Sequence, residues 1–267
     1  MMPLRSTPGV VGAFGDANMA NWRGWTVPGI AVVSAIVLSG VDPIAQSPGY
    51  HQFADDRTML GLPHALDVLS NLAFLVVGLI GLRNCVRYAG GPARVSWFAM
   101  FSGVTLVSAG SAYYHWEPGN WTLVWDRLPM TIGFTGLFVA LLCEFINARL
   151  ARWLPLALIL GGATVFYWYY FDDLRPYGWV QFVPLLSIPL LVALYPARYT
   201  HGWMLVTGLG FYALAKVAEH FDEAIYAAIQ VGGHTIKHLL AAVACWVLAD
   251  MLRRRQPRVG TAPGATR

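Results

Sequence analysis

Apolar residues gather in long segments along this chain, and short polar stretches separate the segments. Seven of them follow one another at residues 64–82, 96–114, 127–146, 153–170, 178–194, 202–219 and 234–251. Each is bounded by charged, glycine or proline residues, and each approaches the roughly 20 residues that an α-helix needs to cross a bilayer. The pattern therefore predicts a core of seven membrane-spanning helices.

A shorter apolar run at residues 27–41 precedes these seven segments. The core of a signal peptide is an alternative interpretation, but no clear small-residue cleavage site follows and the preceding region is not strongly basic. We therefore expect an additional N-terminal helix at residues 27–42, after a mobile tail at residues 1–26. The core domain would span residues 64–251, and a basic cytoplasmic tail would follow at residues 252–267.

The composition supports an integral membrane protein. Hydrophobic residues make up 57% and charged residues 12% of the 267 positions, whereas soluble domains are roughly 45–50% apolar and about 25% charged. The expected fold class is an all-α integral membrane protein, with a seven-helix core bundle plus one additional N-terminal transmembrane helix. The three cysteines lie in or beside apolar segments without a pairing pattern, so we expect them to be packing residues.

The arginines predict the orientation of the helices. If the helices alternate in direction and both chain ends share one side, 13 arginines fall on that side and three on the other. The three are Arg57, Arg127 and Arg175. Cytoplasmic loops carry an excess of basic residues, so both termini are expected in the cytoplasm. The basic cluster at residues 253–258 is more typical of a segment that fixes membrane topology or contacts anionic lipid than of one that binds nucleic acid.

Three histidines and a carboxylate lie at the ends of apolar segments, and the alternation places them together at the outer face. His115 closes the sequence Gly-Ser-Ala-Tyr-Tyr-His, and Asp126 follows eleven residues later. His234 and His238 are four apart, so on a helix they share a face and can bind one ion. Catalytic zinc commonly takes three protein ligands and a water. The two histidines of the last segment could instead bond to neighbouring helices, but His115 and Asp126 at the same depth favour a hydrolytic metal site.

Asp126 and Ser111 each allow two interpretations. Asp126 could be the N-cap of the helix predicted from residue 127, because Asp and Pro both suit a helix start. Its carboxylate could also accept a proton from a metal-bound water, and the two roles are compatible. Ser111 lies four residues before His115 and shares its helical face, although most serines in membrane helices only bond back to a carbonyl.

These motifs resemble the alkaline ceramidase family of the CREST group of membrane hydrolases. The pattern consists of Gly-Ser-x-x-x-His, ten residues, Asp-x-Leu-Pro-Met and a later His-x-x-x-His, with Ser70-Asn71-Leu72 before them. The resemblance covers about residues 64–251. It implies a zinc-dependent amidase that acts on the N-acyl bond of ceramide or a related lipid amide.

The resemblance also implies roles for individual residues. Zinc would be bound by His115, His234 and His238, while Asp126 would position and deprotonate the water and Ser111 would steady the oxyanion. Imidazole ligands also suit iron, nickel or copper. Family members with a calcium site carry an Asp-Trp and Glu-rich segment near the first core helix. This chain has Asp55-Asp56-Arg57 and His64 there, which argues against calcium as a second cofactor.

Lys216, Glu219 and Asp222 are spaced by three and are expected on one helical face. They could form an internal salt-bridged strut, or they could orient a zinc histidine together with Lys237. Asp67, Ser70 and Asn71 are expected to form hydrogen bonds between helices.

Three alternatives to the lipid amidase stay open. A receptor related to the adiponectin-receptor branch would have a similar three-histidine zinc site, and a lipid-remodelling hydrolase would act on esters. A transporter with a proton relay is disfavoured, because no polar chain leads toward the other face. The expected partners are a lipid amide substrate and the bilayer, without nucleic acid; the sequence does not indicate an oligomeric state.

Overall fold

The computed structural model describes residues 22–258, with side chains from residue 25 onward. Apart from two isolated β-bridges, the regular structure in this range is helical. The α-helices are α1 (Trp22–Ser39), α2 (Ala65–Ser70), α3 (Leu72–Tyr88), α4 (Arg94–Trp116), α5 (Asn120–Phe145), α6 (Leu154–Phe171), α7 (Arg175–Leu194), α8 (Trp203–His220), α9 (Asp222–Ile229) and α10 (Gly233–Arg254). Two 3₁₀ helices, η1 (Pro48–His51) and η2 (Ala148–Trp153), lie in the connections.

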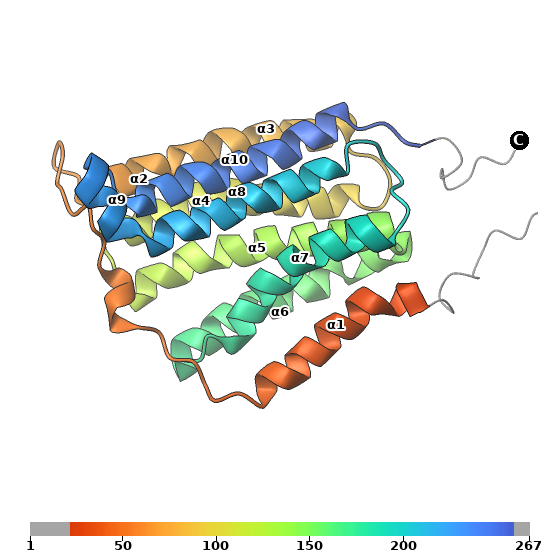
Figure 1. Ribbon diagram of the computed structural model, residues 1–267, viewed down its shortest axis with the longest axis horizontal. Coiled ribbons are helices and arrows are strands. Elements are labelled where there is room, and N and C mark those ends of the chain that lie inside the picture. Colours follow the sequence, from red (N-terminus) through yellow and green to blue (C-terminus); the bar gives the residue numbers. More distant parts are fainter. Residues whose placement is uncertain (1–21, 259–267) are drawn as a thin grey trace, which may run out of the picture.

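Successive long helices run in opposite directions along one bundle (Figure 1). The end of α4 and the starts of α5 and α10 therefore lie at the same end of the molecule. The start of α1 and the end of α10 lie at the opposite end, as the predicted alternation requires. α8 lies beside α10, and α4 lies between α3 and α5.

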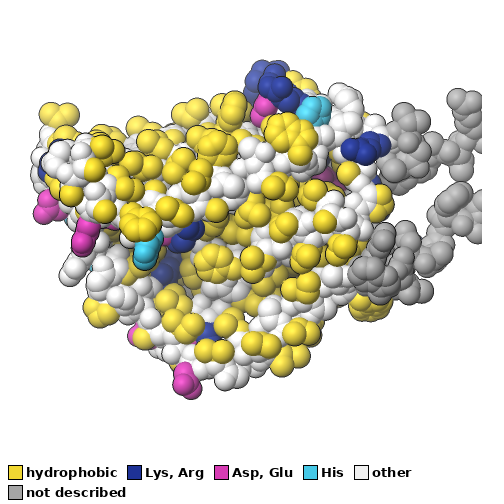
Figure 2. Space-filling view, in the orientation of Figure 1, with side chains coloured by type: hydrophobic (Ala, Val, Ile, Leu, Met, Phe, Trp, Pro, Cys, Tyr) yellow, Lys and Arg dark blue, Asp and Glu magenta, His cyan; other side chains and the backbone are white. Residues whose placement is uncertain are grey.

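Six helical stretches in the described part of the chain are long and apolar enough to cross a membrane. They cover Ala65–Tyr88, Arg94–Trp116, Asn120–Phe145, Ala148–Phe171, Arg175–Leu194 and Gly233–Arg254. The all-helical prediction is confirmed, but the count of seven plus one is not. α8 is outside the six and carries Lys216 and Glu219 near its end, and the apolar part of α1 at Trp25–Ser39 is shorter. Figure 2 shows hydrophobic side chains over most of one face, which fits a lipid environment.

α1 begins earlier than expected and packs at the edge of the bundle. Residues 22–26 are helical rather than part of a tail, and the helix ends at Ser39. Residues 1–21 of the expected tail and residues 259–267 lie outside the described residues. The indole nitrogen of Trp179 on α7 donates to the carbonyl of Ala31 at 3.2 Å and to Ser34 Oγ at 3.1 Å. These bonds attach α1 to α7.

The prediction that α5 starts near residue 127 was wrong. The helix begins at Asn120 after Gly119, so Asp126 lies inside it and is not its N-cap. Pro129 is also inside the helix and cannot donate to the carbonyl of residue 125 four positions earlier. That carbonyl faces α4, where a Cβ on Gly110 would lie 2.0 Å from the Trp125 oxygen. Glycine thus lets the two helices approach closely around the proline.

Candidate metal centre

The three histidines form one buried cluster. His115 lies in the last turn of α4, and His234 and His238 lie in the first turns of α10. Their candidate ligand atoms all lie within 4.8 Å of one another. The exposed fractions of the three residues are 1%, 6% and 2%. The predicted grouping is confirmed, and the cluster could hold a metal ion.

The donor set fits a metal. Nδ1 of His115 is buried and has no hydrogen-bond partner among the described residues. Leaving such an atom unpaired costs free energy that a bound cation would offset. At His238, Nδ1 lies 2.8 Å from Ser70 Oγ, so Nε2 is the ring nitrogen free to bind an ion. The hydroxyl of Ser70 thus fixes the orientation of the His238 imidazole, as hydrogen-bond partners of ligating histidines do in metal sites.

The hydrogen bond between Ser70 and His238 was missed by the sequence analysis. We expected Ser70 to bond between helices, but its partner on a metal-type histidine 168 positions away was not predicted. A second bond between α2 and α10 joins Thr235 Oγ1 to Asp67 Oδ1 at 2.5 Å. The expectation of interhelical bonding is confirmed for Asp67 and Ser70, whereas the amide of Asn71 donates to the carbonyl of Asp67 in its own helical stretch.

The segment before α2 covers the cluster from the end of the bundle. The ring centroid of Phe53 lies 4.6 Å from that of His115 and 4.9 Å from that of His234. The backbone N–H of Ala54 donates to Asp222 Oδ2 at 3.0 Å, and Asp222 Oδ1 accepts from the N–H of His234 at 2.9 Å. Nothing in the apolar pattern singles out Phe53, because its role depends on how a loop folds back.

Asp126 and Ser111 lie beside the cluster in a cavity of about 310 Å³ that His238 also lines. They are 8% and 3% exposed, and their side chains interact with each other. The remaining lining comes mostly from apolar residues of α4, α5, α7, α8 and α10. The structure thus brings a carboxyl group, a hydroxyl group and an imidazole to one apolar space.

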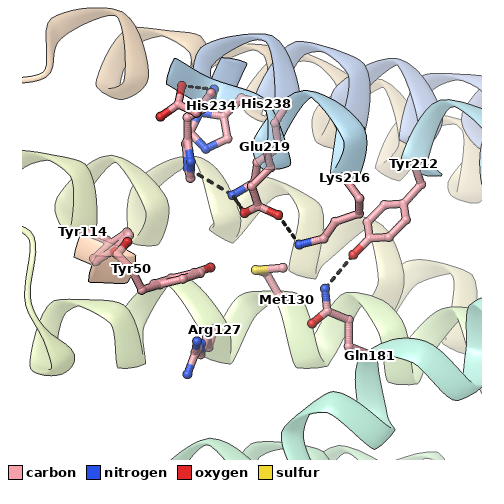
Figure 3. Close-up of polar contacts among 12 residues, drawn as sticks. Tyr50, Tyr114, Arg127, Met130, Gln181, Tyr212, Lys216, Glu219, His234 and His238 are labelled. Atoms are coloured by element: carbon pink, nitrogen blue, oxygen red, sulfur yellow. Dashed lines mark hydrogen bonds and ion pairs between the residues drawn. The ribbon is translucent and has the colours of Figure 1, made fainter. Parts of the chain in front are cut away.

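A row of charged groups continues from the cluster along the cavity wall (Figure 3). Lys237 Nζ lies 3.0 Å from His234 Nε2 and 2.7 Å from Glu219 Oε1. The other oxygen of Glu219 pairs with Lys216, so the predicted salt bridge within α8 is present. Asp222 is not on that face, because α8 ends at His220 and Asp222 begins α9.

Outside the membrane-spanning helices, Asp55 forms a two-pronged ion pair with Arg57. Nε of Arg57 donates to Oδ1 at 2.7 Å and Nη2 donates to Oδ2 at 2.6 Å. These hydrogen bonds hold the pKa of Asp55 below its ordinary value. Nη2 also donates to the carbonyl of Gln230 at 2.7 Å, which joins the covering segment to the end of α9. Both oxygens of Asp55 are therefore already engaged by a cation.

A protein-family model described as Ceramidase matches residues 64–253. The chain belongs to the ceramidase family. The match covers the bundle from α2 to α10 and includes all three clustered histidines, Ser111 and Asp126. No curated protein matches the chain. Membership of the ceramidase family, which the motifs predicted, implies a hydrolase that acts on an amide bond of a lipid. Helix α1 lies before the part that matches the ceramidase family.

Proposed function

We propose that this chain is a zinc-dependent intramembrane amidase that hydrolyses the N-acyl bond of ceramide or a related lipid amide. The carrying observation is the convergence of three buried histidines beside Asp126 in a largely apolar cavity. Membership of the ceramidase family supports the same reaction. The products are a free fatty acid and a sphingoid base, or the corresponding amine.

His115, His234 and His238 would hold the zinc ion, which lowers the pKa of a bound water from about 15.7 to about 7 and polarises a carbonyl group. Asp126 takes a proton from the attacking water. The water oxygen bonds to the carbonyl carbon, the C–N bond breaks, and Asp126 passes the proton to the leaving nitrogen. The hydroxyl of Ser111, one turn before His115, donates a hydrogen bond to the carbonyl oxygen as negative charge develops there.

The cavity suits a lipid substrate. Its apolar walls would bury the acyl chain, while the amide lies at the polar end beside Asp126. Because the site lies at one end of a membrane-spanning bundle, the acyl chain of the lipid can remain in a hydrocarbon environment while the amide reaches the site. We also propose that both termini are cytoplasmic and that the metal centre faces the outer side. The excess of arginines in the segments at the end opposite the histidines supports this orientation.

The deciding experiment measures fatty-acid release from a panel of ceramides by the purified protein. Release should disappear after chelation and return with zinc, and the variant His238→Ala should release none. His220→Ala is the matched control, because His220 is an exposed histidine at the end of α8. An ester with the same acyl chain tests the lipid-remodelling alternative. Stoichiometric zinc without release from any amide would contradict the proposal.

A further inference from the structure

The cavity beside the metal centre contains more positive than negative side chains. Among the residues that line it, the cations are Arg127, Lys216 and Lys237 and the carboxyl groups are Asp126 and Glu219. Charges inside an apolar space are costly unless an opposite charge neutralises them. The lining therefore carries one positive charge in excess, and a divalent ion at the histidines would add to it.

Glu219 is shared between two lysines. Its two oxygens bind Lys216 and Lys237 separately, and Lys237 also contacts His234. One carboxylate cannot neutralise two ammonium groups. The side chain of Lys216 is 40% exposed, compared with 19% for Lys237, and Glu219 is the one ion-pair partner it has in the described structure. Lys216 is therefore the lysine best able to bind another anion.

Arg127 is the third cation of the lining and lies on α5, across the cavity from Glu219 (Figure 3). It is 4% exposed and forms no ion pair with a carboxylate within residues 22–258. Its guanidinium carbon lies 3.9 Å from the centre of the Trp168 ring and 4.7 Å from that of Tyr177. Nη2 donates to Gln46 Oε1 at 2.6 Å, while Nη1 is buried and has no hydrogen-bond partner among the residues that the structure describes. Aromatic faces stabilise a cation but do not neutralise it.

We propose that the substrate carries an anionic group on the amine side of its amide, and that Lys216 is the specificity-determining residue that binds this group. The inference rests on the proposed amidase function. The charged row begins at the histidines beside the scissile amide and reaches Lys216 along one wall of the cavity. An ammonium group in that wall suits the polar amine half of the substrate better than a hydrocarbon chain. Arg127 adds to the positive potential. The substrate class is an N-acyl amine with a carboxylate, sulfonate or phosphate, such as an N-acyl amino acid.

The alternative is a purely structural role, in which the salt bridge between Lys216 and Glu219 only stabilises α8. A brace three residues apart on one helix would affect folding regardless of substrate charge. Binding of an anionic group, in contrast, must depend on the charge of the ligand. Figure 2 shows Lys or Arg side chains inside a hollow of the otherwise apolar face, where a lipid head group can reach them.

The test compares an N-acyl amino acid that has a free carboxylate with its methyl ester and with neutral ceramide, using the zinc-loaded full chain. We expect kcat/KM to be about tenfold or more higher for the free carboxylate, as a charge-assisted hydrogen bond allows. Lys216→Met should lower that value about tenfold and leave the methyl ester within twofold. Lys216→Arg should retain the preference. Arg83→Met removes one exposed positive charge on α3 and should leave kcat/KM unchanged for both the free acid and the methyl ester.

Sulfonate and phosphate analogues of the same amide identify which anion is preferred. Equal kcat/KM for the free acid and the methyl ester, or an equal loss for both in Lys216→Met, would overturn the inference and leave the amidase function intact. If the wild type hydrolyses no amide, the proposed function fails. The inference is then tested by binding of an alkylsulfonyl amino acid, which is not hydrolysed, and its methyl ester. Tighter binding of the acid that Lys216→Met abolishes supports it, and equal Kd values overturn it.

Discussion

Ser70 Oγ lies 2.8 Å from Nδ1 of His238, so a hydroxyl on α2 orients an imidazole on α10. The same hydroxyl donates its proton to the carbonyl of Asp67 at 2.9 Å, and its oxygen must therefore accept from Nδ1–H. Nε2 of His238 then carries the free lone pair, which is the form that binds a metal. The hydrogen bond thus selects the tautomer that the proposed site requires.

Removing this hydroxyl should weaken the metal site. We expect Ser70→Ala to lower zinc affinity about 10–100-fold, because supporting hydrogen bonds to ligating histidines typically contribute that much. Competition with a coloured chelator measures the change. Ser96→Ala is the control, because Ser96 is buried and its Oγ has no partner in the described structure. Equal zinc affinity in both variants would show that Ser70 does not orient His238.

The close approach of α4 and α5 beside the site should depend on Gly110. A methyl group there would lie 2.0 Å from the Trp125 carbonyl oxygen, which belongs to backbone and cannot rotate away. Because the helices must move apart, Gly110→Ala should displace Ser111 and Asp126 and lower amide hydrolysis on the order of 100-fold. Thermal unfolding should also shift to lower temperature. The measurement is hydrolysis rate together with Tm.

Gly210→Ala provides the matched control for that prediction. Gly210 is also inside a helix, but a Cβ there would meet no atom of the described residues within 4 Å. Alanine has a higher helix propensity than glycine, so this variant should be neutral or more stable by up to about 1 kcal/mol. If both variants behave alike, close contact at Gly110 is not what holds the two helices in place.

The sequence was sufficient to group His115 with the two histidines of α10. Long apolar segments fix the direction of each helix, and residues four apart on one helix share a face, so the grouping follows from local rules. The pairing of Ser70 with His238 did not follow, because it joins positions 168 apart and depends on how two helices rotate against each other. Phe53 was missed for a similar reason, since its contact needs a loop to fold over the bundle.

The start of α5 shows where local signals mislead. Asp126 and Pro129 both favour a helix start, yet the helix begins at Asn120 and continues through the proline. The neighbouring Gly110 accommodates the carbonyl that the proline leaves without its usual donor. A packing partner on another helix thus overrides the local preference, and this partner cannot be predicted from the sequence of α5 alone.

At the opposite end of the bundle, a buried ion pair between Glu144 and Arg255 should be important for stability. Nη1 of Arg255 lies 2.8 Å from each Glu144 oxygen, and both residues are 7% exposed. Trp97 Nε1 donates to the same carboxylate at 2.6 Å. Removing one partner of a buried pair leaves an uncompensated charge, so Arg255→Met should cost about 3–5 kcal/mol of unfolding free energy.

Arg254→Met is the comparison for this pair. Arg254 binds Asp250 from a side chain that is 54% exposed, and Arg253 binds the same carboxylate. An exposed pair with a second cation nearby should cost at most about 1 kcal/mol when one arginine is removed. Chemical unfolding in detergent measures both variants, and similar losses would mean that burial of the Glu144–Arg255 pair is not decisive.

The pair of Asp55 and Arg57 should make the covering segment sensitive to acid. Because the pKa of Asp55 in the folded protein lies below the reference value of 3.8, the carboxylate stabilises the fold at all pH values above that reference. The contribution is lost as pH falls through the folded pKa. Asp55→Asn should therefore be less stable than the wild type from pH 7 to pH 5, by about 1 kcal/mol or less because Arg57 is exposed, and the difference should shrink below about pH 4.

Thermal unfolding of the wild type and Asp55→Asn across this pH range tests the assignment, with Asp56→Asn as the control. Asp56 is the exposed neighbour and forms no ion pair in the described structure, so its variant should follow the wild type at every pH. Acid also removes metal from histidines, but it does so equally in all three proteins, and the difference between them isolates Asp55. If the difference in Tm between the wild type and Asp55→Asn stays constant down to pH 3, Asp55 acts through its shape and not through its charge. Because Arg57 already engages both Asp55 oxygens, we further expect a calcium-selective chelator to leave amide hydrolysis unchanged.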